Sequence, residues 1–260
     1  MSVRKKVGLA LSGGAARGFA HLGVYKVLKE NGIPIDCVAG TSAGSFAGAA
    51  IAAGMSVEDI IDVGKEISWY RMSKLNFSAK GLISNQPIGD LIQSRFPSKK
   101  IEDLMIPYAA IATDLESGKE VVFRDSGDLG FAVRASCAIP GIFAPLVDTE
   151  GNQYVDGGIV ANVPTKAVRE LGADVVIAVD VLHSGASYWG TPSSLVGIFF
   201  QSAMMVIRSA SSAHHHMADH VVVPEIAHLR PDEIGKIEEF VELGEKAAKE
   251  SLPRIEELIG

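Results

Sequence analysis

The N-terminal part of the chain alternates short apolar runs with glycine-rich turns and helical patterns. Val7 to Leu11 (VGLAL) reads as a buried strand, and after the turn SGGAARG a helical pattern runs from Gly18 to Asn31. Asp36 to Gly40 predicts a second strand, Thr41 to Gly44 a sharp turn, and Ser45 to Ala53 a helix of small residues. Two successive strand–helix units favour an α/β fold with a mostly parallel sheet.

The rest of the chain continues this alternation. Further strands are predicted over Pro107–Thr113, Glu120–Arg124, a hairpin within Leu146–Val155, Asp174–Asp180 and Val221–Val223. Helices are predicted over Val57–Ile67, Leu129–Ala138, a segment opened by Pro164, Ser194–Ser212 and Pro231 to about Glu250. We expect a three-layer α/β/α arrangement around a mixed, mainly parallel sheet. The sequence contains no repeats and no low-complexity linker, so we interpret residues 1–260 as one domain. Its motifs lie in residues 7–224, and an acidic helical segment occupies residues 231–260.

Composition narrows the functional classes. The 260 residues are 47% hydrophobic and 21% charged, which excludes disorder and predicts a large core. The net charge of −7 argues against a nucleic-acid partner. Two cysteines without a C-x-x-C pair indicate neither a disulfide framework nor a zinc site, and no apolar run approaches the ~18 residues of a membrane span. We expect a cytoplasmic protein that meets the inner membrane face peripherally; nothing in the sequence indicates its oligomeric state.

One segment loses periodicity and is locally basic. Between Ile67 and Gly89 there are three basic residues and no acidic one, and residues 69–86 add Trp69, Tyr70 and Phe77. Such a stretch can close over a site or rest on an anionic membrane surface. An exposed loop with ordinary solvated charges is an equally good interpretation, so a lid at 69–86 is a hypothesis.

The turn after the second strand carries candidate chemistry. Gly40, Thr41, Ser42, Ala43 and Gly44 match G-x-S-x-G, the nucleophile elbow, in which small residues flank a serine on a strained strand-to-helix turn. The predicted strand before it and helix after it supply the context that this motif requires. The alternative is a tight turn with a small polar residue in it.

The turn after the first strand is rich in backbone donors. Gly13-Gly14-Ala15-Ala16-Arg17-Gly18 stands at a strand end, where backbone N–H groups can hold an anion or a developing oxyanion. Ala15 replaces the second glycine of a dinucleotide fingerprint, and no Lys-Ser/Thr follows Gly18 as a phosphate loop requires. Taken alone, the loop could simply begin a helix.

A serine nucleophile needs a base, and the sequence offers a carboxylate and several histidines. Asp156 stands on the turn Asp156-Gly157-Gly158, just past a predicted strand. His183 or His220 would complete the chain order Ser, Asp, His of an α/β-hydrolase, but only 41 residues precede Ser42, too few for the strands that normally come before that elbow.

The remaining histidines favour a structural interpretation. His21 lies in the first predicted helix and is interpreted as a packed or surface residue. His214, His215 and His216 end the apolar helix, and His220 follows at a spacing that can place two imidazoles on one helical face. A metal site there is a minor alternative, because no carboxylate or cysteine cluster accompanies it in the sequence. We therefore expect no metal and no cofactor.

Several ordered motifs together resemble a known family, the patatin-like phospholipases, and in particular their small bacterial members. The resemblance runs from about Val7 to Pro224 and rests on LSGGAARGFAHLGV, GTSAG, ATDLESGKEVVF, RASCAIPGIFAPL, VDGGIVANVP and LGADVVIAVDV. It implies a lipid acyl hydrolase that uses a Ser-Asp dyad without histidine, which places the nucleophile at Ser42 and the base at Asp156.

The resemblance also implies roles around the dyad. The loop from Gly13 to Gly18 would form the oxyanion hole with amides of Gly13, Gly14 and Ala15, while Arg17 and Gly18 would support the loop or meet a phosphate head group. The family's commonest form has glycine where Ala15 stands; an alanine still supplies an N–H, so the hole survives if that backbone does not need a positive φ. Gly40, Gly44, Gly157 and Gly158 would shape the two turns.

The substrate expected from this resemblance is a lipid or another fatty-acyl ester, cleaved without calcium. The apolar helix with Leu195, Ile198 and Met205 is one candidate lining for the acyl chains, although helices of this pattern more often belong to the core. Two alternatives stay open. An acyltransferase would use the same acyl-enzyme, and a catalytically weak acyl-binding regulator would keep the fold.

Overall fold

A mixed sheet forms the centre of the molecule. The computed structural model describes residues 4–66, 83–184 and 195–260. Its eight-stranded sheet has the order β5-β6-β3-β2-β1-β7-β8, and β4 pairs with β3 off this path. The strands are β1 (Val7–Leu11), β2 (Cys37–Thr41), β3 (Tyr108–Asp114), β4 (Glu120–Phe123), β5 (Leu146–Val147), β6 (Gln153–Asp156), β7 (Val175–Val179) and β8 (His220–Val222). Strands β3, β2, β1, β7 and β8 run parallel, as a mainly parallel sheet predicts. Strands β4 and β6 pair antiparallel with β3, and β5 pairs antiparallel with β6.

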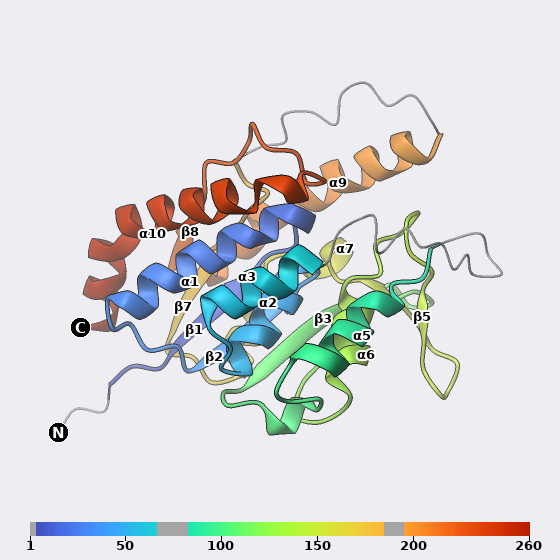
Figure 1. Cartoon of the computed structure of the whole chain (residues 1–260), viewed down its shortest axis with the longest axis horizontal. Helices are drawn as coiled ribbons and strands as arrows, with labels where there is room; N and C mark the ends of the chain where they lie inside the picture. The colour runs from blue at the N-terminus through green and yellow to red at the C-terminus, as the bar shows by residue number, and fades with distance from the viewer. Residues whose placement is uncertain (1–3, 67–82, 185–194) are drawn as a thin grey trace.

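Helices cover both faces of this sheet (Figure 1). The α-helices are α1 (Ala20–Glu30), α2 (Ala43–Ala52), α3 (Val57–Glu66), α5 (Gln86–Arg95), α6 (Leu129–Ser136), α7 (Gly158–Ala161), α8 (Thr165–Glu170), α9 (Leu195–His214) and α10 (Ile237–Ile259). Short 3-10 turns are η1 (Ala15–Phe19), η2 (Ile101–Asp103), η3 (His215–Met217) and η4 (Ile234–Lys236). Among the described residues, none of the helices has both the length and the apolar content to cross a bilayer.

The two faces of the sheet carry side chains of different size. Toward α1, α2 and α10 the central strands present large residues, among them Leu9, Tyr108 and Ile177. On the opposite face a row of alanines runs across four strands in register, formed by Ala109, Ala39, Ala10 and Ala178. Because a methyl group fills little space, α7 and α8 pack close to this face. The turn after β6 is thereby held close to the sheet.

Helices α1 and α10 lie side by side although they are far apart in sequence (Figure 1). Their backbones approach through two glycines: a Cβ on Gly23 would lie 2.0 Å from the Val241 carbonyl oxygen, and one on Gly244 would lie 2.1 Å from that of Ala20. The C-terminal helix is therefore part of the layer that supports the first strand–helix unit.

Some elements differ from the sequence-based prediction. Helix α5 was not predicted. Helix α10 begins at Ile237, later than Pro231, and continues through Pro253 to Ile259. Most of the hypothetical lid at 69–86, and the loop over 185–194, lie outside the described residues. Both cysteines are free and buried, as expected.

Candidate active site

The turn between β2 and α2 has the strained geometry of a nucleophile elbow. Ser42 adopts φ +54° and ψ −124°, in the region that L residues rarely visit. A Cβ on Gly40 would lie 2.1 Å from the Gly44 carbonyl oxygen, and one on Gly44 would lie 2.2 Å from that of Leu11. Both positions therefore need glycine, which explains the G-x-S-x-G spacing.

Strand register brings Asp156 to the elbow. Thr41 pairs with Ile111 across β2 and β3, and the next residue of β3, Ala112, pairs with Asp156. The Ser42 hydroxyl forms a hydrogen bond with the Asp156 side chain. The Asp156 Oδ1 accepts a second hydrogen bond from the Gly158 N–H at 2.8 Å. The two residues that the motifs single out are thus adjacent, although 114 positions separate 42 from 156.

Burial raises the proton affinity of this carboxyl group. Asp156 is 4% exposed, and loss of solvation raises its pKa from 3.8 to about 6, against the opposing effect of its hydrogen bonds with Ser42 and Gly158. Among the described residues, the hydrogen-bond partners of the Ser42 and Asp156 side chains include no histidine. The arrangement provides a hydroxyl group and a carboxylate of raised basicity in direct contact.

The loop after β1 packs directly against the elbow. A Cβ on Gly13 would lie 3.1 Å from the Ser42 Cβ, and one on Gly18 would lie 2.6 Å from the Ala43 Cβ. The Gly13 N–H already donates to the Asn162 carbonyl at 3.3 Å. Within the described part of the chain, the N–H groups of Gly14 and Ala15 donate no hydrogen bond. These two amides are therefore the available donors beside the hydroxyl group.

Ala15 does occupy a left-handed conformation. Its φ is +51°, so the backbone at this position has the geometry that favours glycine. A non-glycine residue there costs roughly 1 kcal/mol or more. The loop keeps its shape with an alanine in place of the commoner glycine, but it is strained at that residue.

The Arg17 side chain braces the loop from inside the protein. It is fully buried, and its Nε and Nη2 donate to the Leu229 carbonyl at 3.1 and 2.7 Å. Burial and the nearby Arg208 lower its pKa to about 10. Of the two roles expected for Arg17, the structure fits loop support, because the guanidinium group has no solvent exposure. Contact with a head group stays a prediction.

An apolar pocket opens beside the serine. It has a volume of about 120 Å³, and its lining includes Ser42, Ala15, Leu22, Phe46, Ile60 and Phe143. These side chains come from the large-residue side of the sheet and not from α9. On α9, Ile198, Met205 and Val206 are exposed and Ile207 is buried, so none of these four lines the pocket. The described pocket therefore takes no lining from these side chains, and a contribution of α9 to an acyl trough stays a prediction.

Two buried polar residues that the sequence analysis missed hold the site together. Asn162 accepts from Gly13 through its carbonyl group and donates from its Nδ2 to the Ser211 Oγ at 2.9 Å. Ser136 accepts from the Ser42 N–H at 2.9 Å. Asn162 lies six positions after Asp156 in DGGIVANVP, which was its one sequence clue.

The histidines from the end of α9 onward are arranged differently from the prediction, whereas His21 is packed inside the protein, as one of its two interpretations expected. His21 is buried, its Nε2 lies 2.8 Å from the Ser12 carbonyl oxygen, and burial lowers its pKa to about 4. Helix α9 ends at His214 and His220 begins β8, so His216 and His220 do not share a helical face. The absence of a neighbouring carboxylate was also a wrong expectation, because the His215 Nε2 lies 2.8 Å from Oδ2 of Asp180.

Comparison with known proteins agrees with the motifs. The family model for patatin-like phospholipase matches residues 9–169. The chain therefore belongs to the patatin-like phospholipase family, and the resemblance noted in the sequence is confirmed.

Individual relatives extend this result. An NTE family protein of Mycobacterium bovis is 39% identical over 184 residues, which cover 70% of this chain and 50% of that protein. Lysophospholipase NTE1 of Coccidioides immitis is 38% identical over 183 residues, covering 68% of this chain and 12% of that protein. The crystal structure of VipD from Legionella pneumophila has a TM-score of 0.57 at 15% identity, over 97% of this chain and 67% of that one, and so shares the fold. The chain spans at most about half the length of these curated relatives.

Proposed function

We propose that the protein is a serine lipid acyl hydrolase that cleaves fatty-acyl esters through Ser42 and Asp156. The observation that carries the proposal is the Ser42 hydroxyl, hydrogen-bonded to a buried carboxylate at the edge of an apolar pocket. Membership of the patatin-like phospholipase family supports the same chemistry, as does the name of the lysophospholipase among its relatives. The substrate class is a lipid or another ester with an apolar acyl chain.

In the first half-reaction Asp156 acts as general base. Its carboxylate accepts the hydroxyl proton of Ser42 as Oγ attacks the carbonyl carbon of the ester. The negative charge that develops on the carbonyl oxygen is stabilised by the N–H groups of Gly14 and Ala15. The protonated Asp156 then donates its proton to the leaving alkoxide oxygen. The products are an alcohol and an acyl group bound to Ser42.

In the second half-reaction water replaces the alcohol. Asp156 takes a proton from the water molecule as the water oxygen attacks the acyl carbonyl carbon. Asp156 then passes this proton to the Ser42 Oγ when the fatty acid leaves. If an alcohol such as glycerol attacks in place of water, the same steps transfer the acyl group. Product analysis with glycerol present distinguishes an acyltransferase, which forms a glycerol ester, from a hydrolase, which forms the free acid.

The test is release of p-nitrophenol from short- and long-chain acyl esters, with EDTA present throughout. We expect Ser42→Ala and Asp156→Asn each to lower kcat by about a thousandfold or more, as loss of a nucleophile or its base typically does. Activity should be indifferent to EDTA. Retained folding of each variant is checked by circular dichroism.

A matched pair of histidine variants tests the alternative base. His183→Gln and His220→Gln should retain activity within a few-fold, because neither side chain hydrogen-bonds Ser42 or Asp156 in the described structure. Activity that survives in Asp156→Asn and disappears in either histidine variant would contradict the dyad and indicate a hydrolase with a Ser-Asp-His triad. No hydrolysis or transfer by the wild type, together with acyl-chain binding, would favour the regulator.

A further inference from the structure

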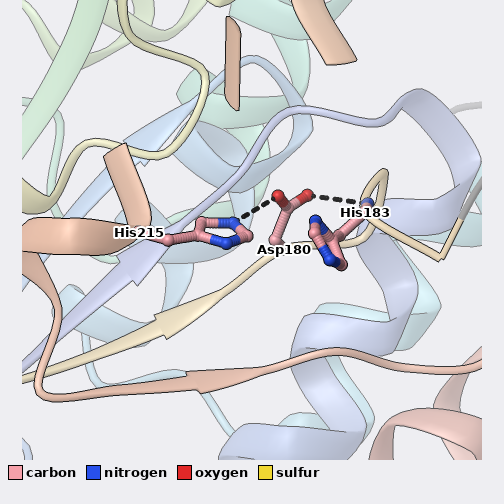
Figure 2. Close-up of side chains that lie close together, drawn as sticks. All are labelled: Asp180, His183 and His215. Atoms are coloured by element: carbon pink, nitrogen blue, oxygen red, sulfur yellow. Dashed lines mark hydrogen bonds and ion pairs between the residues drawn. The ribbon is translucent and has the colours of Figure 1, made fainter. Parts of the chain in front are cut away.

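A second group of titratable side chains gathers outside the catalytic dyad (Figure 2). Asp180 follows β7, His183 comes three residues later, and His215 begins η3 after α9. One ligand atom from each of the three lies within 4.8 Å of the others. The two imidazole rings have centroids 4.8 Å apart and planes inclined by 51°. Both rings therefore face the same carboxylate from different elements of the fold.

The carboxylate in this group is held in one orientation. Oδ1 of Asp180 accepts from the backbone N–H groups of Leu182 at 2.9 Å and His183 at 3.1 Å, and Oδ2 lies 2.8 Å from the His215 Nε2. The backbone thus occupies one oxygen, and the other is directed at the His215 imidazole. Backbone donors that fix a carboxylate in this way are typical supports of a metal ligand.

Charge also points to a cation. Asp180 has no solvent exposure, and within the described residues its one ion-pair partner is His215. A buried carboxylate is stable when it is paired with a positive group or coordinates a metal. A metal ion bound by Asp180 and the two imidazoles would supply that charge.

The donor set selects a class of metal. Two imidazole nitrogens and one carboxylate oxygen suit zinc and similar divalent ions, whereas calcium and magnesium prefer oxygen ligands throughout. A tetrahedral ion with bonds of about 2.0–2.1 Å holds its ligand atoms about 3.3 Å apart. Rotation of the exposed His183 side chain can bring its nitrogen to that spacing. Solvent reaches the group from the His183 side and can supply the fourth ligand.

We propose that Asp180, His183 and His215 form a binding site for a divalent transition-metal ion of the zinc class. Binding replaces the contact between the His215 Nε2 and Asp180 with bonds from both side chains to the metal, and a proton on that nitrogen moves to Nδ1 of the same ring or to solvent. This site is separate from the dyad, and the proposal does not depend on the ester hydrolase function.

The position of the site gives the ion a structural role. The Val181 N–H donates to the Ser12 Oγ at 3.0 Å, and a Cβ on Gly14 would lie 2.4 Å from the Val181 Cγ2. The turn that contains Asp180 therefore packs against the loop after β1 and supports it. On the other side, the His214 carbonyl accepts from the Thr165 hydroxyl at 3.0 Å. A bound ion would link the end of β7 to the end of α9 without touching the substrate.

The test uses Co²⁺ and Zn²⁺ alone as probes on the full chain carrying Ser42→Ala, so that ester chemistry has no influence on the result. We expect one Co²⁺ per chain with the intense visible absorption of a tetrahedral site, and Zn²⁺ should displace it. Zn²⁺ should also raise Tm, because an ion that binds the folded state stabilises it. His183→Gln and His215→Gln should each weaken binding tenfold or more.

His216→Gln is the matched control, because His216 is an exposed neighbour of His215 in the same turn. It should leave the absorption and the affinity unchanged. Equal loss in His216→Gln and His215→Gln would assign the metal to the histidine run and overturn the site, as would Co²⁺ binding that is weak, octahedral or insensitive to His183→Gln. His183 is exposed, so its variant tests the site even if His215→Gln fails to fold.

Discussion

Two aspartates in this protein occupy nearly the same local structure and have different surroundings. Asp156 is the last residue of β6, and Asp180 directly follows β7. Each is buried, and in each Oδ1 accepts from the N–H two residues later, at 2.8 and 2.9 Å. What differs is the group at the other end of the carboxylate. Asp156 meets the Ser42 hydroxyl, and Asp180 meets the His215 imidazole.

The partner therefore determines the chemistry that the same turn can support. A hydroxyl group donates one hydrogen bond and brings no charge, so burial dominates at Asp156 and raises its pKa to about 6. The Asp156 carboxylate is therefore a stronger base than an ordinary aspartate, and keeping it ionised in the folded protein costs free energy. An imidazole at Asp180 can carry a charge or bind a metal. The turn motif alone therefore does not distinguish the two carboxylates. The side chain that each one contacts indicates which chemistry it can support.

The largest expected effect separates the two carboxylates by activity. Asp156→Asn should lower kcat by about a thousandfold or more, because the variant side chain cannot accept the Ser42 proton. Asp180→Asn should stay within about tenfold of the wild type, since Asp180 acts only through the loop that it supports. Parallel ester assays of the two variants measure the contrast. Similar losses in both would mean that the two turns act as one unit.

The pH dependence of the rate is the next test. In the proposed mechanism Asp156 acts in its ionised form, so kcat/KM should rise about tenfold per pH unit below its pKa of about 6 and level off above it. At pH 4 the rate constant should be about a hundredfold below the plateau. Asp180→Asn should keep the same midpoint. A midpoint near the ordinary aspartate value would show that the carboxylate is not desolvated in the working enzyme.

Stability should respond in the opposite direction from activity. The folded-state pKa of Asp156, about 6, lies above the ordinary 3.8, so its contribution to stability is fully present below pH 3.8 and is lost as the pH rises through 6. The difference corresponds to about 3 kcal/mol. Asp156→Asn should therefore raise the free energy of unfolding at pH 8 by about 1–3 kcal/mol, and the gain should shrink at pH 5.

The matched variant Asp180→Asn should lose stability instead, by about 1–2 kcal/mol, because it weakens the acceptor for two backbone N–H groups and for His215. Urea unfolding of both variants at pH 8 and pH 5 provides the measurement. A destabilised Asp156→Asn at pH 8 would contradict the view that this carboxylate is costly to bury.

The smallest expected effect concerns the loop between the two turns. Ala15→Gly relieves roughly 1 kcal/mol of backbone strain but adds freedom to the unfolded chain. We expect the free energy of unfolding to change by less than about 1 kcal/mol, with activity retained, as measured by urea unfolding and ester assay. Gly14→Ala should lower the free energy of unfolding more than Ala15→Gly does, because the new Cβ would lie 2.4 Å from the Val181 Cγ2. A larger loss in Ala15→Gly would show that the Ala15 methyl group contributes packing.

Much of the fold followed from local patterns. The apolar runs of β1, β2 and β7 were visible in the sequence. The turns after β1, β2 and β6 were visible as well, because glycines that the close packing requires mark these three strand ends. The helix pattern failed where packing overrides it. Helix α10 continues past Pro253, which a sequence pattern treats as a stop.

The rest of the site depends on long-range contacts. Asn162 gives no motif of its own, and its role appears only when β1, α7 and α9 come together. Likewise, His215 meets Asp180 across 35 positions because α9 ends where it does. The single-domain interpretation of residues 1–260 stays a prediction.

The support of the loop by distant carbonyl groups has a consequence for biosynthesis. The Ala16 N–H donates to the Pro231 carbonyl at 2.9 Å, and Arg17 reaches the Leu229 carbonyl across 212 positions. Chains emerge from the ribosome N-terminus first, at roughly 5–20 residues per second. Ser42 is therefore translated many seconds before the groups that hold the neighbouring loop in place. A nascent chain therefore carries the proposed nucleophile early and gains a fully braced loop only after residue 231 has been released. Under the proposed function, we expect ester cleavage to begin only when the chain is nearly complete.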